Sequence, residues 1–243
     1  MTHYKLVLEY DGAAYHGWQE QPGEVTVGGA VRDAIARLTG ERPRLDAAGR
    51  TDAGAHSLGQ TISFNLEREL DPERLAHSLN AVLPTDIAVR EAATVEPGFH
   101  ARFSARRRTY RYLVDNRQER GALLRERAWH IRQPLDLGAM RTAAADLLGE
   151  NDLSAFGSDP AGRNTVRELS RLRVRRLRDG LVVFDLTANA FLYGMVRRMV
   201  GFLVEVGLGR RPAAESRQLL LPGAVAASRV APALGLYQLA VEY

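Results

Sequence analysis

The order of strand and helix patterns along the chain constrains its fold most. Residues 4–10 alternate apolar side chains and stop at Asp11-Gly12, as a half-buried strand does. A helix pattern follows at residues 27–38, with Thr26 as the expected N-cap and Gly40 at its end. The next expected elements are a strand at 60–66, a helix opened by Asp71-Pro72, and a closing strand at 86–93. This order predicts a β-α-β-β-α-β-like half.

The rest of the chain repeats the order of elements, without a repeat at the level of residues. Asp136 is placed to cap a helix, and Asp179-Gly180 predicts a hairpin turn. The expected strands are 109–115, 166–177, 181–189 and 236–243, and a helix is expected at 193–206. We therefore expect an α+β fold with two halves, residues 1–104 and 105–243. Their strands would form one broad, mainly antiparallel sheet with helices packed on one face.

Composition excludes several classes of protein. The 243 residues contain no cysteine, so disulfides, thiol nucleophiles and thiolate metal sites are excluded. The six histidines show no metal-ligand spacing, and we expect neither a metal nor a cofactor. No apolar run reaches the roughly 18 residues of a membrane span, and the first residues lack the pattern of a signal peptide. We expect a soluble, cytoplasmic protein.

The basic residues are almost all arginine. Of 33 lysines and arginines only Lys5 is a lysine, and the net charge is +4. Arginine grips phosphate with a planar donor fork, which suits a nucleic-acid surface, while a GC-rich genome or heat adaptation would also enrich it. Arg171, Arg173 and Arg175 share one face of an expected strand, as either a phosphate-binding stripe or a solvated face.

A carboxylate lies between glycines in the stretch Gly49-Arg50-Thr51-Asp52-Ala53-Gly54-Ala55-His56. The stretch has neither helical nor alternating apolar periodicity, so we expect a loop. One interpretation is a solvated turn, in which the aspartate caps its own backbone. The other is a loop whose glycines allow close backbone approach and present one reactive side chain to a ligand.

Two further segments carry candidate functional side chains. Residues 101–112 combine five arginines with Tyr110 and Tyr112, a mixture that suits phosphate binding and base stacking. Core packing is the favoured interpretation for Tyr112, while for Tyr110 stacking and core packing are both open. Arg197 interrupts an apolar helix, so it either snorkels or pairs with a carboxylate such as Asp52, keeping that carboxylate ionised and aimed.

Together these motifs closely resemble the tRNA pseudouridine synthase A family over essentially the whole chain. The resemblance rests on the Asp52 stretch, on Phe99-His100-Ala101-Arg102-Phe103-Ser104-Ala105 leading into Arg108-Thr109-Tyr110-Arg111-Tyr112, and on Met195-Val196-Arg197 with Val200-Gly201. Departures are small: Ala55 replaces a common valine, and Tyr193-Gly194 a common histidine pair. The resemblance implies two ferredoxin-like-related halves and a homodimer.

The resemblance also implies an isomerase that converts uridine to pseudouridine in the anticodon stem-loop of tRNA, at positions thirty-eight to forty. By resemblance Asp52 is the nucleophile, Arg197 pairs with it, Tyr110 stacks on the target uracil, and Arg50 helps to displace that base. Attack on uracil C6 and attack on ribose C1′ both remain open. The alternatives are a non-catalytic tRNA-binding protein or RNA chaperone on the same scaffold, and an aspartate-nucleophile hydrolase of small molecules.

Overall fold

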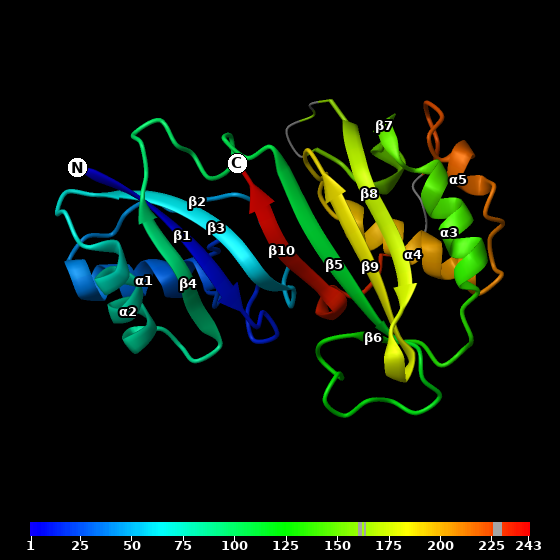
Figure 1. Ribbon diagram of the computed structural model, residues 1–243, viewed down its shortest axis with the longest axis horizontal. Coiled ribbons are helices and arrows are strands. Elements are labelled where there is room, and N and C mark those ends of the chain that lie inside the picture. The colour runs from blue at the N-terminus through cyan, green and yellow to red at the C-terminus, as the bar shows by residue number, and fades with distance from the viewer. Residues whose placement is uncertain (160–161, 163, 226–229) are drawn as a thin grey trace. The chain divides into compact units, whose positions relative to one another are not determined.

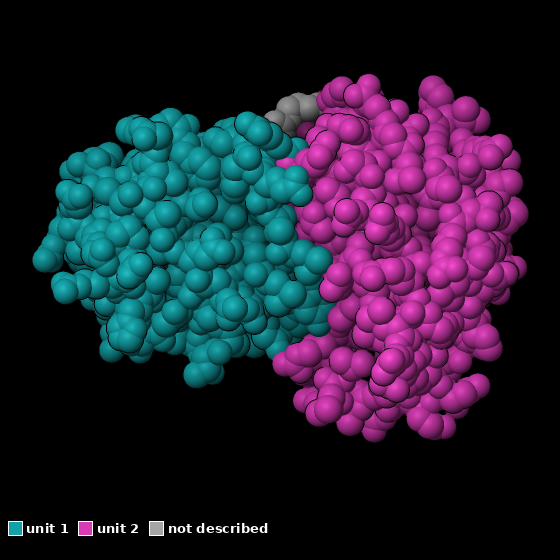
Figure 2. Space-filling model, in the orientation of Figure 1, with its two compact units in different colours: residues 1–106, 237–243 teal, residues 107–236 magenta. Residues whose placement is uncertain are grey.

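The computed structural model describes residues 1–159, 162, 164–225 and 230–243, which form two compact units (Figures 1 and 2). The first unit comprises residues 1–106 and 237–243, and the second comprises residues 107–236. The last strand therefore belongs to the first unit, although it ends the chain. The functional division at residues 104/105 stays a prediction.

Four strands of the first unit lie side by side in the order β4-β1-β3-β10, and the two-residue strand β2 pairs with β3. The elements are β1 (Thr2–Tyr10), α1 (Val27–Thr39), β2 (Asp46–Ala47), β3 (His56–Leu66), α2 (Pro72–Val82), β4 (Ile87–Thr94) and β10 (Leu236–Glu242). Strand β1 is antiparallel to both β3 and β4, while β10 runs parallel to β3. With β2 included, residues 1–94 have the predicted β-α-β-β-α-β order.

Both helices of the first unit pack on the same face of its strands. Tyr4, Leu6 and Leu8 of β1 join Val31 of α1 and Leu79 of α2 in one buried cluster. The predicted caps are confirmed. The Thr26 side chain accepts a hydrogen bond from the Gly29 amide, Asp71 accepts one from Arg74, and Gly40 ends α1 with a left-handed φ of 76°. Local sequence signals therefore fix where these helices begin and end.

The second unit has the strand order β5-β9-β8-β7, with antiparallel neighbours, and β6 lies parallel to β5. Its strands are β5 (Arg107–Asp115), β6 (Trp129–His130), β7 (Gly149–Asp152), β8 (Val166–Arg176) and β9 (Leu181–Ala188). Its helices are α3 (Leu137–Asp146), α4 (Met195–Gly207) and α5 (Glu215–Gln218), and short 3-10 turns cover Ser154–Phe156 and Ala233–Gly235. Asp136 caps α3, as predicted.

Helix α4 lies behind β8 and β9 in Figure 1, and α3 packs against α4 and β8. Leu172 and Val174 of β8 are buried, whereas the arginines that alternate with them are exposed. The hairpin predicted between β8 and β9 is confirmed, because Asp179 and Gly180 both have left-handed φ values, of 59° and 74°. The α+β class with mainly antiparallel strands is therefore confirmed.

The predicted start of α4 is wrong by two residues. Gly194 has a φ of 72° and precedes the first helical residue, Met195, so Tyr193 lies outside the helix and does not share a helical face with Arg197. A left-handed residue cannot continue a right-handed helix. Within the described part of the chain, none of the helices is long and apolar enough to cross a membrane.

Candidate active site

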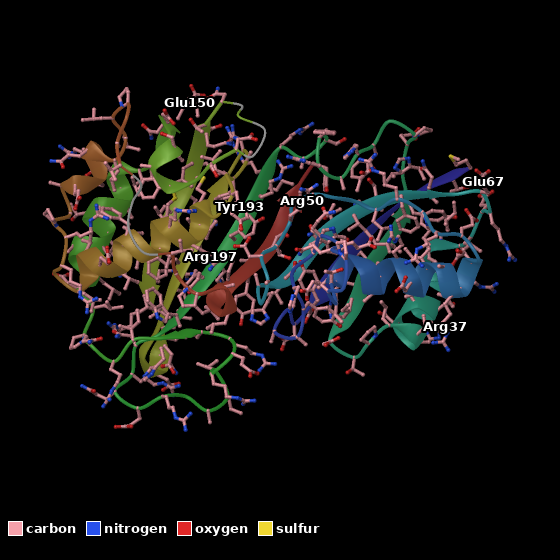
Figure 3. The ribbon with its side chains drawn as sticks, turned by 180° about the vertical axis from the view of Figure 1, so that it is seen from behind. Arg37, Arg50, Glu67, Glu150, Tyr193 and Arg197 are labelled. Atoms are coloured by element: carbon pink, nitrogen blue, oxygen red, sulfur yellow. The ribbon has the colours of Figure 1, made fainter. Side chains whose placement is uncertain are left out.

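Asp52 lies on the loop that joins β2 to β3 in the first unit. The two strands pair antiparallel, with Asp46 opposite Ser63, and the Gln60 side chain donates a 2.6 Å hydrogen bond to the Gly49 carbonyl. The start of the loop, up to Gly49, is therefore held by the strand pairing and by Gln60. Asp52 is half-buried and Arg50, labelled in Figure 3, is exposed, so the loop is held at Gly49 and is accessible to solvent at these two side chains.

A second segment, residues 12–18, holds the middle of this loop. The Trp18 amide donates to the Thr51 carbonyl, and the Gly54 amide donates to the Tyr15 carbonyl, both at 3.1 Å. Gly17 has a φ of 85°, and a Cβ placed on it would lie 2.6 Å from the Thr51 carbonyl oxygen. Only glycine allows this approach of two backbones. Close backbone approach at this loop is thus shown by Gly17, a glycine outside the Asp52 stretch that packs against Thr51.

Buried side chains surround the held segment. The Tyr15 hydroxyl donates a 2.6 Å hydrogen bond to Asp86, and burial, followed by this carboxylate, raises the pKa of Tyr15. His56 is buried, its Nδ1 accepts a hydrogen bond from the Gly12 amide, and its ring stacks on Tyr237 with centroids 4.7 Å apart. His56 therefore has a supporting position at the end of the loop.

Tyr110 and Tyr112 lie on the helix-covered face of β5 in the second unit. Tyr112 is fully buried and donates a 2.6 Å hydrogen bond to the Pro232 carbonyl, which confirms its expected place in the core. Tyr110 is 8% exposed, and its ring meets Phe191 edge-on with centroids 4.9 Å apart. The edge-on contact fixes the plane of the Tyr110 ring.

Arg197 is half-buried on α4, where Figure 3 labels it. Its Nε donates a 2.7 Å hydrogen bond to the Ala231 carbonyl. Burial raises the pKa of the Tyr112 phenol, and the positive charge of Arg197 acts in the opposite direction. The guanidinium is therefore held close to the core of the second unit.

The predicted site residues are distributed over both units. Arg50 and Asp52 share one loop of the first unit, and Tyr110 and Arg197 belong to the second. The roles assigned to these four residues, and the pairing of Asp52 with Arg197, stay predictions. Sequence patterns missed the contribution of Tyr10, whose hydroxyl contacts Thr51. Its only sequence signal is a hydroxyl on the core face of a strand, just before Asp11-Gly12.

The arginine stripe of β8 lies on the face away from α3 and α4. Arg171, Arg173 and Arg175 are exposed there, as the alternation predicted. Asp185 of the neighbouring strand β9 accepts hydrogen bonds from Arg111 at 2.7 Å and from Arg175 at 2.5 Å. Burial raises the pKa of Asp185, but these two guanidinium groups outweigh it and hold that pKa below its usual value.

The donor groups needed for a metal do not come together in the part of the chain that the structure describes: no group of three or more histidines, aspartates or glutamates there could hold an ion. The Asp52 loop carries a carboxylate, Asp52, and an exposed guanidinium, Arg50. This arrangement allows nucleophilic chemistry by the carboxylate.

Comparison with known proteins assigns the family. The family model described as tRNA pseudouridine synthase matches residues 6–104 and 143–243. The chain is 42% identical to tRNA pseudouridine synthase A of Acetivibrio thermocellus over 100% of both chains, and 43% identical to that of Geobacter sulfurreducens over 96% of each. A chain of a solved archaeal box H/ACA sRNP Nop10-Cbf5 complex overlaps 82% of this chain and 45% of its own length, at 10% identity and a TM-score of 0.39. The identity and full-length coverage show that this chain belongs to the tRNA pseudouridine synthase family.

Proposed function

We propose that this protein isomerises uridine to pseudouridine in the anticodon stem-loop of tRNA, at positions thirty-eight to forty, with Asp52 as the nucleophile. The observation that carries the proposal is a half-buried carboxylate on a loop whose backbone is fixed at Gly49, Thr51 and Gly54. A fixed backbone holds a nucleophile in a constant direction, which favours covalent attack. The family supports the substrate class, since the relatives named above are tRNA pseudouridine synthases.

The isomerisation breaks one bond and forms another. The bond between ribose C1′ and uracil N1 breaks, the ring turns, and C1′ bonds to C5. The C5 proton leaves to solvent and N1 gains a proton, so atoms and electrons balance without an oxidant or reductant. Asp52 attacks either uracil C6 or ribose C1′ and is released as a free carboxylate at the end.

Three other side chains complete the proposed site. Tyr110 stacks on the target uracil, and its edge-on contact with Phe191 supports this role by fixing the ring plane. Arg197 pairs with the Asp52 carboxylate, and its hydrogen bond to Ala231 orients the guanidinium. Arg50 is exposed on the same loop as Asp52, which suits a group that helps to displace the target base from its stack.

RNA binding, a homodimeric state and cytoplasmic location belong to the same proposal. The exposed arginines of β8 support contact with phosphates. Light scattering on the purified protein should give twice the 26.8 kDa mass of the chain. A mass of one chain would contradict the homodimer and would leave the proposed chemistry unaffected.

The alternative function is that of a non-catalytic tRNA-binding protein, and Asp52→Asn separates the two. We expect this variant to lose tritium release from tRNA labelled at uridine C5, because an amide is a poor nucleophile, and to bind tRNA nearly as well as the wild type. The matched control is Asp33→Asn, an exposed aspartate of α1 paired with Arg42, which should release tritium normally. Full release by Asp52→Asn would contradict the proposal.

A further inference from the structure

A buried tyrosine of the first unit ends its strand against the residue that precedes Asp52. Tyr10 is the last residue of β1 and only 2% exposed. Its backbone is fixed between two strands, opposite Ser57 of β3 and Ile87 of β4. The hydroxyls of Tyr10 and Thr51 share a 2.8 Å hydrogen bond. The side chain therefore links a central strand directly to the Asp52 loop.

Thr51 is held through both its side chain and its backbone. Its carbonyl accepts the hydrogen bond of the Trp18 amide, and its hydroxyl shares the bond with Tyr10. Two attachments on different sides of one residue leave its backbone little freedom to rotate. Because Asp52 follows directly, and its own carbonyl accepts from the Ala55 amide, the direction of the carboxylate depends on how Thr51 is held.

Tyr4 shows what a comparable tyrosine does elsewhere on the same strand. It lies on the same face of β1, is fully buried, and its hydroxyl also makes polar contacts, donating to the Leu70 carbonyl and accepting from the Leu70 amide. Leu70 directly precedes Asp71, the N-cap of α2, and takes no part in the Asp52 loop. Tyr4 is therefore a buried, hydrogen-bonded tyrosine of the same strand that has no connection to the candidate nucleophile.

We propose that the Tyr10 hydroxyl is a positioning group for Asp52, acting through the hydroxyl of Thr51. This inference rests on the proposed function, since it assigns Tyr10 a part in the reaction of that loop. A small misplacement of a reacting group costs a large factor in rate, so a single buried hydrogen bond next to a nucleophile matters more than its effect on folding. The predicted effect is on the chemical step and leaves tRNA binding unchanged.

The test compares Tyr10→Phe with Tyr4→Phe. Tyr10→Phe loses the hydrogen bond to Thr51, and Tyr4→Phe loses two hydrogen bonds to Leu70, so Tyr4→Phe should show a fall in Tm at least as large as that of Tyr10→Phe. With enzyme in excess over C5-tritiated tRNA, Tyr10→Phe should lower the single-turnover rate at least about tenfold, with a Kd for tRNA within about twofold of wild type. Tyr4→Phe should keep its rate within about twofold. Equal rates for Tyr10→Phe and wild type, or equal losses in both variants, would overturn the inference.

A second pair of variants tests the same bond from its other end. Thr51→Val removes the hydroxyl and Thr51→Ser retains it, so the serine variant should be at least about fivefold faster. The double variant Tyr10→Phe/Thr51→Val should be no slower than the slower single variant, because both changes remove one interaction. Additive losses would contradict the inference. If Asp52→Asn stays active the proposed function fails, whereas an inactive Asp52→Asn beside an unaffected Tyr10→Phe rejects only the positioning role.

Discussion

Arg197 and Ala231 hold each other through two hydrogen bonds. The Nε of Arg197 donates to the Ala231 carbonyl at 2.7 Å, and the Ala231 amide donates back to the Arg197 carbonyl at 3.1 Å. One bond uses the side chain of the helix residue and the other its backbone. A planar guanidinium held at Nε has a defined direction, which a point charge on a flexible chain lacks.

This relationship predicts that lysine cannot replace Arg197. The Arg197→Lys variant keeps the positive charge but loses the bond from Nε and the orientation of the remaining donors, so we expect the single-turnover rate to fall about a hundredfold. The matched control is Arg198→Lys, the next residue of α4, which should retain the rate within about threefold. Comparable losses in both variants would show that α4 is sensitive to any arginine replacement, and would reject the specific role of Arg197.

The parts of the fold that sequence predicted are those with local signals. Thr26, Asp71 and Asp136 cap helices where the sequence placed them, because a cap acts on amides two or three residues away. The start of α4 was misjudged, since apolar spacing continues back to Tyr193 and does not reveal the left-handed φ of Gly194. The strand β2 was missed because two residues cannot show a period.

At the candidate site, too, only the features with a local sequence signal were predictable. The glycines around Asp52 indicated a loop, and Gly54 has a left-handed φ of 78°. The contact of Tyr10 with Thr51 was not predictable, since Tyr10 continues the core alternation of β1 and the partner of its hydroxyl depends on tertiary structure. The parallel pairing of β10 with β3 brings together residues 181 positions apart, Tyr237 and His56, and no local pattern specifies it.

Gly17→Ala should destabilise the protein more than Gly23→Ala. Both glycines have left-handed φ values, of 85° and 79°, so both changes cost about 1 kcal/mol of backbone strain. A Cβ on Gly17 would also lie 2.6 Å from the Thr51 carbonyl oxygen, whereas a Cβ on Gly23 meets nothing within 4 Å. We expect a total loss above about 2 kcal/mol for Gly17→Ala in urea unfolding. Equal losses of unfolding free energy in the two variants would show that the loop backbone moves to make room for the methyl group.

Asp185→Asn should reduce stability in a pH-dependent way. Arg111 and Arg175 hold the folded-state pKa of Asp185 below its unfolded value of about 3.9, despite burial. The stabilisation is therefore present above about pH 4 and is lost as pH falls through the folded pKa. At pH 7 we expect a loss of about 1 kcal/mol, since both arginines are partly exposed to solvent.

The measurement is urea unfolding of wild type and Asp185→Asn from pH 7 down to about pH 3. The difference in the free energy of unfolding should shrink below about pH 4. The exposed pair of Asp33 and Arg42 supplies the control, because Asp33→Asn should change stability by less than about 0.5 kcal/mol at every pH. A difference between wild type and Asp185→Asn that stays constant with pH would show that its cause is packing and not charge.

The double variant Arg171→Gln/Arg173→Gln should weaken tRNA binding and should make that binding less dependent on salt concentration. Each lost phosphate contact reduces, by about 1, the steepness with which the logarithm of the tRNA association constant falls against the logarithm of salt concentration. We therefore expect a change of about 2 if both arginines contact the RNA backbone. The matched control is Arg37→Gln/Arg68→Gln, which removes the same charge from exposed positions of the first unit. Filter binding over a range of KCl concentrations measures both. If Arg37→Gln/Arg68→Gln reduces the salt dependence as much, the arginines of β8 act only through the net charge of the protein. Direct phosphate contacts would be lost only in the β8 variant.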